Sequence, residues 1–128
     1  MMIEIKKYIP TYAPLLKQLM LREGEEWTYT EDTLWHGYET MLAEHITYVA
    51  FEDDVLCGFV RCLRDGIIAV YVCDLLVDKT HRGQQIGHLL MRTVCDDYPT
   101  HAVYVMSDVD VHYEKQGYKR EGSIFEVC

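Results

Sequence analysis

The stretch DLLVDKTHRGQQIGHLLM, residues 74–91, decides the fold of this chain because a buried strand, a basic turn and an amphipathic helix follow one another in it. Residues 67–77 are apolar at almost every position, as expected of a central strand that is covered on both faces. Residues 86–97 place apolar side chains on one side of a helix, which stops before Pro99. A strand that leads through a short turn into a helix is typical of an α/β domain.

The turn in this stretch is predicted to bind an anion. The first N–H groups of a helix have no partner within it, and the helix dipole adds partial positive charge there. Gly83 and Gly87 let the backbone approach a ligand closely, and Arg82 can add charge. The Gly-x-Gly-x-x-Gly and Walker patterns are absent, so neither a Rossmann nor a P-loop nucleotide site is indicated.

Working outward from this stretch, alternating and continuous apolar runs predict the other elements. Thr11 is expected to cap a first helix that ends at Gly24, and a second helix is expected after Thr30. The predicted order is βααβββαβαβ, an α/β (α+β) domain on a mixed sheet. Its remaining expected elements are strands at 1–9, 46–51, 55–64, 101–107 and 124–127, and a short helix within 109–117.

Composition limits the classes of protein to which the chain can belong. With 128 residues, 49% of them hydrophobic, residues 1–128 are expected to form a single domain with its own core. A net charge of -9 argues against nucleic acid as a partner. No apolar run approaches the ~20 residues of a membrane helix, and the N-terminus lacks a signal sequence. We therefore expect a cytoplasmic protein without a membrane partner.

The five cysteines form neither a C-x-x-C pair nor a zinc-type spacing with histidine. Free thiols and no bound metal are therefore expected.

The charges are unevenly distributed along the chain. From Glu23 to Asp54 there are ten acidic residues and no lysine or arginine, whereas three basic residues and two histidines lie between Lys79 and Arg92. The basic segment fits the predicted anion site. The acidic segment suits either a cationic partner or an ordinary solvated surface, and both interpretations stay open.

Two motifs resemble one known family. Residues 74–91 resemble the acyl-CoA-binding motif of the GNAT superfamily of N-acetyltransferases, whose core is usually written Q/R-x-x-G-x-G/A. Arg82 matches its first position and Gly87 its last, but Gln85 stands where the first glycine belongs. Residues 112–122, HYEKQGYKREG, resemble the family's FYEKxGF segment. The family has the same βααβββαβαβ order, so the resemblance covers nearly the whole chain.

The resemblance implies an activity. The GNAT reaction is direct transfer of an acetyl group from acetyl-CoA to a primary amine, here expected to be a small cationic amine. Acetylation of a protein amino group and a non-catalytic acyl-CoA sensor are the alternatives. Residues 23–35, acidic and aromatic, fall where the family forms part of its acceptor pocket, and a homodimer is an open expectation.

The resemblance also implies site residues. The N–H of Val77 should polarise the acetyl carbonyl, and Gln85 is expected to enter the helix without backbone strain. The family has an asparagine before the C-terminal helix, for which Ser107 and Asp108 are candidate substitutes. The expected coenzyme-binding residues are Leu75, Leu76, Val77, Arg82, Gly83, Gln84, Gln85, Ile86, Gly87 and His88.

Two residues are candidates for catalysis. Tyr113 matches the family's tyrosine that stabilises the leaving thiolate. Its neighbour His112 is expected on another face of the helix. Asp74 interrupts an apolar strand, and a buried carboxylate there needs a partner. It is either a general base acting through water or a structural hydrogen-bond acceptor at a strand bulge.

Overall fold

The computed structural model describes residues 2–107 and 109–128, in which a mixed sheet has the strand order β1-β2-β3-β4-β5. Neighbouring strands are antiparallel except for β4 and β5, which are parallel. This confirms the predicted mixed α/β architecture. The strands are β1 (Ile3–Lys7), β2 (Ile46–Glu52), β3 (Val55–Asp65), β4 (Ala69–Val77) and β5 (Ala102–Val105).

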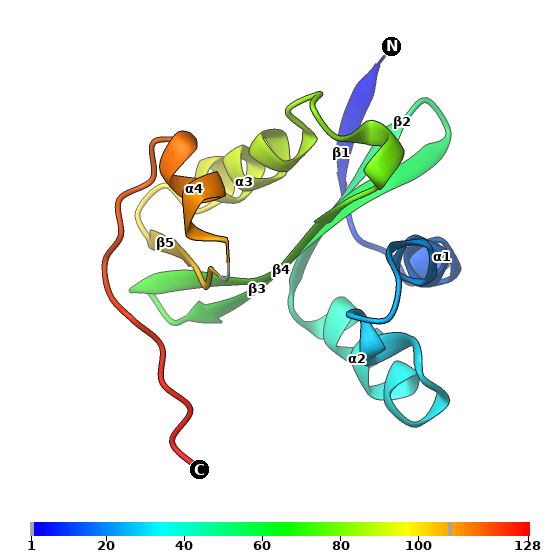
Figure 1. The fold of residues 1–128 in the computed structure, drawn as a ribbon, viewed down its shortest axis with the longest axis horizontal. Helices are drawn as coiled ribbons and strands as arrows, with labels where there is room; N and C mark the ends of the chain where they lie inside the picture. Colours follow the sequence, from blue (N-terminus) through cyan, green and yellow to red (C-terminus); the bar gives the residue numbers. More distant parts are fainter. Residues whose placement is uncertain (1, 108) are drawn as a thin grey trace.

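Helices cover both faces of the sheet and bury two separate cores. Helices α1 (Ala13–Glu23) and α2 (Asp32–Glu44) lie on one side, and α3 (Ile86–Asp97) lies on the other (Figure 1). The short helix α4 (Asp110–Lys115) follows β5. Three short 3-10 turns complete the described secondary structure: η1 (Pro10–Tyr12), η2 (Thr28–Thr30) and η3 (Lys79–His81).

The start of α1 differs from the prediction. Thr11 does not cap the helix, because it lies inside η1, where Tyr12 N–H already bonds to Ile9 O at 2.9 Å. The chain is therefore turning before α1 begins, and Thr11 lacks the extended backbone of an N-cap. Gly24, with φ 116°, follows the last helical residue as predicted.

Strands β3 and β4 are out of regular register at one point. Asp74 pairs with Arg61, but the next residue of β3, Cys62, pairs with Val72, so Cys73 is an extra residue on β4. Such a bulge re-aims neighbouring side chains. It sits where β4 and β5 part, since their pairing ends at Val72.

The predicted C-terminal strand at 124–127 is wrong. Residues 118–128 have no regular secondary structure, and Ile124, Phe125 and Val127 are 70%, 82% and 91% exposed. This tail runs past α4 and away from the sheet (Figure 1). An alternating apolar pattern forms a strand only when a neighbouring strand pairs with it, and none of the described strands does.

The described residues contain neither a membrane-spanning helix nor a metal-binding cluster. No helix there is long and apolar enough to cross a membrane. Within residues 2–107 and 109–128, no group of three histidine, cysteine or acidic side chains is arranged to hold a metal ion. All five cysteines are free thiols, as expected.

Candidate active-site cleft

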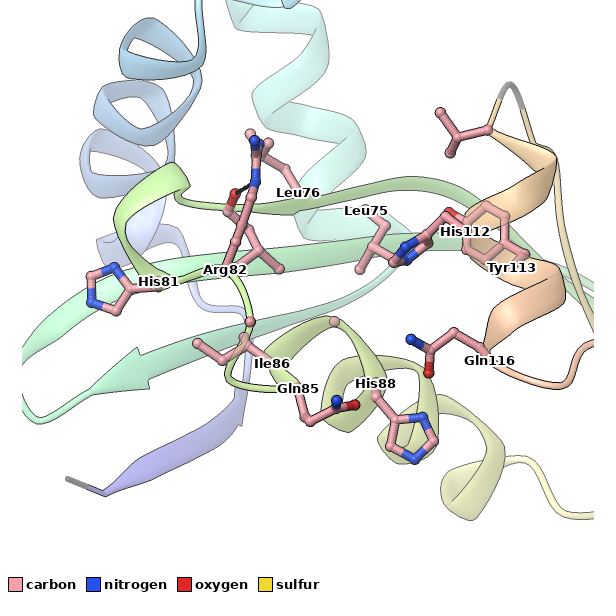
Figure 2. A pocket seen from close by; sticks show the side chains of 14 residues that line it. Leu75, Leu76, His81, Arg82, Gln85, Ile86, His88, His112, Tyr113 and Gln116 are labelled. Atoms are coloured by element: carbon pink, nitrogen blue, oxygen red, sulfur yellow. Dashed lines mark hydrogen bonds between the residues drawn. The ribbon is translucent and has the colours of Figure 1, made fainter.

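A cavity of about 630 Å³ lies between the end of β4, the β4–α3 turn and α4 (Figure 2). Apart from Gln84, every predicted coenzyme-binding residue lines it, and so does Tyr113. Asp74 is not among the lining residues. The lining residues are Leu75, Leu76, Val77, His81, Arg82, Gly83, Gln85, Ile86, Gly87, His88, Val109, His112, Tyr113 and Gln116.

One wall of the cleft is an open strand edge. β4 pairs with β3 along its whole length, but its pairing with β5 ends at Val72. On the β5 side, backbone groups between Asp74 and Val77 therefore have no neighbouring strand among those that the structure describes. An extended ligand can add to such an edge as a further strand would.

The opposite wall is the start of α3. The first hydrogen bond into this helix runs from Leu89 N–H to Gln85 O, so the N–H groups of residues 86–88 precede the helical bonding pattern. A Cβ added to Gly87 would lie 3.8 Å from Val77 Cγ2 and 3.9 Å from Leu75 Cδ2. Glycine at this position therefore keeps open the space between the helix start and β4.

The backbone at Gln85 contradicts the expectation of an unstrained helix entry. Gln85 has φ 65° and ψ 21°, a left-handed conformation that costs a residue with a Cβ roughly 1–2 kcal/mol. Gly83 also has a positive φ, of 85°. Two of the residues 83–85 therefore have a positive φ. The second of them, Gln85, stands at the position where the related motif has glycine.

Arg82 and His81 of the turn contact acidic side chains from α1 and β2. Arg82 Nη2 lies 2.8 Å from Glu23 Oε1 of α1, and Arg82 Nε donates to Val77 O at 3.2 Å. His81 Nε2 lies 3.0 Å from Glu52 Oε2. Glu23 of the acidic segment thus balances the charge of Arg82. Arg82 therefore offers less positive charge to a ligand than an unpaired arginine in the turn would.

An ion pair between Arg22 and Asp78 fixes the beginning of the turn. Arg22 Nη2 lies 3.0 Å from Asp78 Oδ2, and Thr80 N–H donates to Asp78 Oδ1 at 3.3 Å. Burial alone would raise the pKa of Asp78, but the Thr80 N–H and the Arg22 guanidinium outweigh burial and hold it below its usual value. Asp78 therefore stays ionised and ties the end of β4 to α1.

Asp74 belongs to a buried network next to the cleft. Its Oδ2 accepts hydrogen bonds from Arg61 Nε at 2.8 Å and from Tyr38 Oη at 2.7 Å. Arg61 Nη1 also lies 3.0 Å from His45 Nδ1. Burial and then the Asp74 carboxylate raise the pKa of Tyr38, so its hydroxyl remains a donor. These bonds at the bulge favour the structural alternative for Asp74 over the general base.

Helix α4 contributes the aromatic side of the cleft. The rings of His112 and Tyr113 are 5.1 Å apart, and Figure 2 shows His112 directed toward Leu75. The expectation that His112 lies on another face is wrong, because this short helix lies along the cleft and adjacent residues both border it. Sequence reasoning also missed Val109 and Gln116. Asp108, a predicted asparagine substitute, lies outside the described residues, and Ser107 does not line this cleft.

Comparisons with known proteins agree with this geometry. Residues 13–118 match the model of the acetyltransferase (GNAT) family. Among solved structures, a GNAT-family acetyltransferase from Streptococcus pneumoniae TIGR4 superposes with a TM-score of 0.76 at 23% identity, covering 98% of each chain. No curated protein sequence matches the chain.

Two other solved structures share the fold. An aminoglycoside acetyltransferase from an uncultured soil sample has a TM-score of 0.72 at 19% identity, over 100% of this chain and 99% of that one. The PaiA N-acetyltransferase of Thermoplasma acidophilum, solved with coenzyme A, has a TM-score of 0.68 at 20% identity, over 94% of this chain and 92% of that one.

Proposed function

The chain belongs to the GNAT acetyltransferase family, and from this premise we propose that it transfers the acetyl group of acetyl-CoA to a primary amine, a small cation. One observation carries the proposal. The cleft joins an open strand edge, a helix start with unpaired N–H groups and Tyr113. A long ligand with an anionic end and an extended arm fits these three features together.

Different residues of the cleft would bind different parts of acetyl-CoA. The N–H groups of residues 86–88 would hold the pyrophosphate, with Gly83 and Gly87 leaving room for it. Leu75 and Val77 would bond the pantetheine arm through their backbone groups, as a strand does. The N–H of Val77 would polarise the carbonyl of the thioester. The PaiA enzyme of the same fold was solved with coenzyme A, which supports coenzyme A as the ligand.

When bound, the thioester supplies the acetyl group: the amine nitrogen bonds to the carbonyl carbon, the carbon–sulfur bond breaks and the thiol is released. The amine must first lose a proton. A lysine-like amine with a pKa of about 10.4 is roughly one part in a thousand free base at pH 7.4, equivalent to about 4 kcal/mol. Water or a cleft side chain takes this proton, and we assign Asp74 the positioning of Tyr38 and Arg61 instead.

Tyr113 would donate a hydrogen bond to the departing sulfur. A phenol with a pKa near 10 and a thiol near 8.5 differ by about 2 kcal/mol, so full proton transfer from tyrosine to thiolate is uphill. Tyr113 therefore stabilises the thiolate while keeping its own proton. Its place in the cleft wall supports this role.

The test is thiol release from acetyl-CoA against a panel of amines, corrected for hydrolysis, with wild type beside Tyr113→Phe. We expect turnover of one amine class and at least a tenfold fall of kcat in the variant. If no amine is acetylated although acetyl-CoA raises the melting temperature, the catalytic proposal is overturned and an acyl-CoA sensor replaces it. Turnover that is the same in Tyr113→Phe would remove only the role of Tyr113.

A further inference from the structure

A second cavity, of about 710 Å³, lies between the β4–β5 edge of the sheet, α4 and the C-terminal tail. Its volume is typical of small-molecule sites. Figure 1 shows the tail passing outside α4 and β5 on this side of the molecule. The lining residues are Tyr71, Tyr104, Val105, Met106, Ser107, Asp110, Tyr113, Glu114, Tyr118, Lys119, Arg120, Glu121, Gly122, Ser123 and Ile124.

The floor of this cavity is aromatic. Tyr71 of β4 and Tyr104 of β5 are partners in the parallel register, and their ring centroids lie 5.6 Å apart with planes tilted by 30°. Their neighbours Val70 and Val72 face the α3 core, so the tyrosines face the opposite side of the sheet. The two tyrosines are 38% and 39% exposed, so both present ring surface to solvent within the cavity.

The wall formed by α4 is acidic. Asp110 and Glu114 both line the cavity, and their i,i+4 spacing places them on the same side of the helix. On the opposite wall, Lys119 and Glu121 form an ion pair at 3.5 Å and cancel each other. Arg120 donates to Ser123 at 3.3 Å. That hydrogen bond leaves the positive charge of Arg120 in place, so the lining carries three carboxylates and two cations, a net charge of -1, and two of the carboxylates lie on the α4 wall.

The two cavities meet at one side chain. Tyr113 lines both the coenzyme cleft and this second cavity. A molecule held against the tyrosine pair thus has one end beside the residue proposed to stabilise the leaving sulfur. Such an arrangement is what direct transfer between two bound substrates requires.

We propose that the second cavity is the acceptor site, in place of the pocket at residues 23–35 that the resemblance implied, and that the acceptor is a primary amine joined by a short flexible arm to a flat aromatic ring. None of residues 23–35 lines this cavity. This inference rests on the proposed acetyltransferase function. The ring lies on Tyr71 and Tyr104, and the ammonium group is drawn toward Asp110 and Glu114 beside Tyr113. A purely aliphatic polyamine satisfies the acidic wall but leaves the two ring faces without a matching partner.

The first experiment compares acceptors on the wild-type enzyme. The probes are 2-phenylethylamine, hexylamine and spermidine, each at saturating acetyl-CoA. We expect kcat/KM for 2-phenylethylamine to exceed that for hexylamine at least tenfold, because the two amines carry similar charge and differ in the ring. Equal values for these two amines, or a preference for spermidine, would overturn the aromatic assignment.

The second experiment changes the floor of the cavity. The combined Tyr71→Leu, Tyr104→Leu variant should raise KM for 2-phenylethylamine at least fivefold and leave KM for acetyl-CoA unchanged. Leu63→Ala is the matched control, since Leu63 pairs with Tyr71 and is exposed but does not line the cavity. An equal rise in both KM values, or the same effect in the control, would contradict the proposal.

A third variant changes the acidic wall of the cavity and remains informative if the tyrosine variant fails to fold. Asp110→Asn combined with Glu114→Gln should raise KM for the cationic amine several-fold, with Glu44→Gln as an exposed control. An unchanged KM rejects the acidic wall as the ammonium site. If some amine is acetylated but none of these effects is seen, the acceptor assignment fails alone. If no amine is acetylated and 2-phenylethylamine does not bind in calorimetry with coenzyme A present, both proposals fail.

Discussion

Arg82 of the β4–α3 turn forms an ion pair with Glu23 at the end of α1, with 2.8 Å between Nη2 and Oε1. The pair joins segments that lie 59 residues apart in the sequence. It draws a guanidinium of the turn proposed to bind the pyrophosphate toward a carboxylate of the protein. If the proposal holds, Glu23 competes with the pyrophosphate for the same cation.

Removing this competitor should strengthen coenzyme binding. In Glu23→Gln we expect the Kd for coenzyme A to fall about 1.5- to fivefold, since an ion pair whose arginine is half exposed is worth roughly 0.2–1 kcal/mol. Calorimetry at low salt measures the change, and raising the salt concentration should reduce it. Glu44→Gln, which alters net charge equally without contacting the turn, should leave Kd nearly unchanged. An equal gain in the control would assign the effect to net charge.

Gln85→Gly should stabilise the protein. The left-handed backbone costs glutamine roughly 1–2 kcal/mol, and glycine removes this strain. Glycine also makes the unfolded chain more flexible, which offsets part of the stabilisation. The free energy of unfolding should therefore rise by about 0.5–1 kcal/mol. Urea denaturation measures it. Gln84→Gly is the control, because Gln84 is not among the non-glycine residues with positive φ and should lose stability. A loss in both variants would contradict the strain at residue 85.

A side chain at Gly58 of β3 should be destabilising. A Cβ there would lie 3.1 Å from Leu76 O and 3.4 Å from side-chain atoms of Ile86 and Leu90, so the backbone of β4 would have to shift by a few tenths of an ångström. We expect Gly58→Ala to lower the free energy of unfolding by about 1–3 kcal/mol and to weaken coenzyme binding, because Leu76 and Ile86 line the cleft.

The matched substitution is Gly37→Ala in α2, where an added Cβ has no atom within 4 Å. Alanine in a helix interior is favoured by roughly 0.5–1 kcal/mol, so this variant should be more stable than wild type. Thermal and denaturant melts compare the two. Equal effects at both positions would show that backbone freedom, rather than contact with α3, decides the cost.

Asp74→Asn should act mainly on stability. It leaves Arg61 buried without its carboxylate partner, a change that typically costs about 3–5 kcal/mol. Tyr38→Phe keeps the ion pair and removes one hydrogen bond, which should cost about 0.5–1.5 kcal/mol. Melting curves with kcat of the folded fraction separate the roles. If Asp74→Asn folds as wild type does but loses kcat a hundredfold, Asp74 is the base after all.

The sequence by itself determined the positions of most elements, because their signals are local. Apolar runs located β2, β3 and β4, and Gly24 and Pro99 marked the ends of α1 and α3. The two motifs in register gave the family. The turn residues around Gly83 and Gly87 were found because glycines before a helix are recognisable without knowledge of their neighbours.

Only the tertiary structure decided which side chains meet across these elements. The partners of Arg82 and Asp74, Glu23 and Arg61, are set by how α1 packs on the sheet and by the register of β3 on β4. The left-handed Gln85 follows from the path between a fixed strand end and a fixed helix start. A linear pattern records which residues are apolar or charged. Contact between distant residues depends on packing and register, and these exist only once the sheet and its two helical layers have formed.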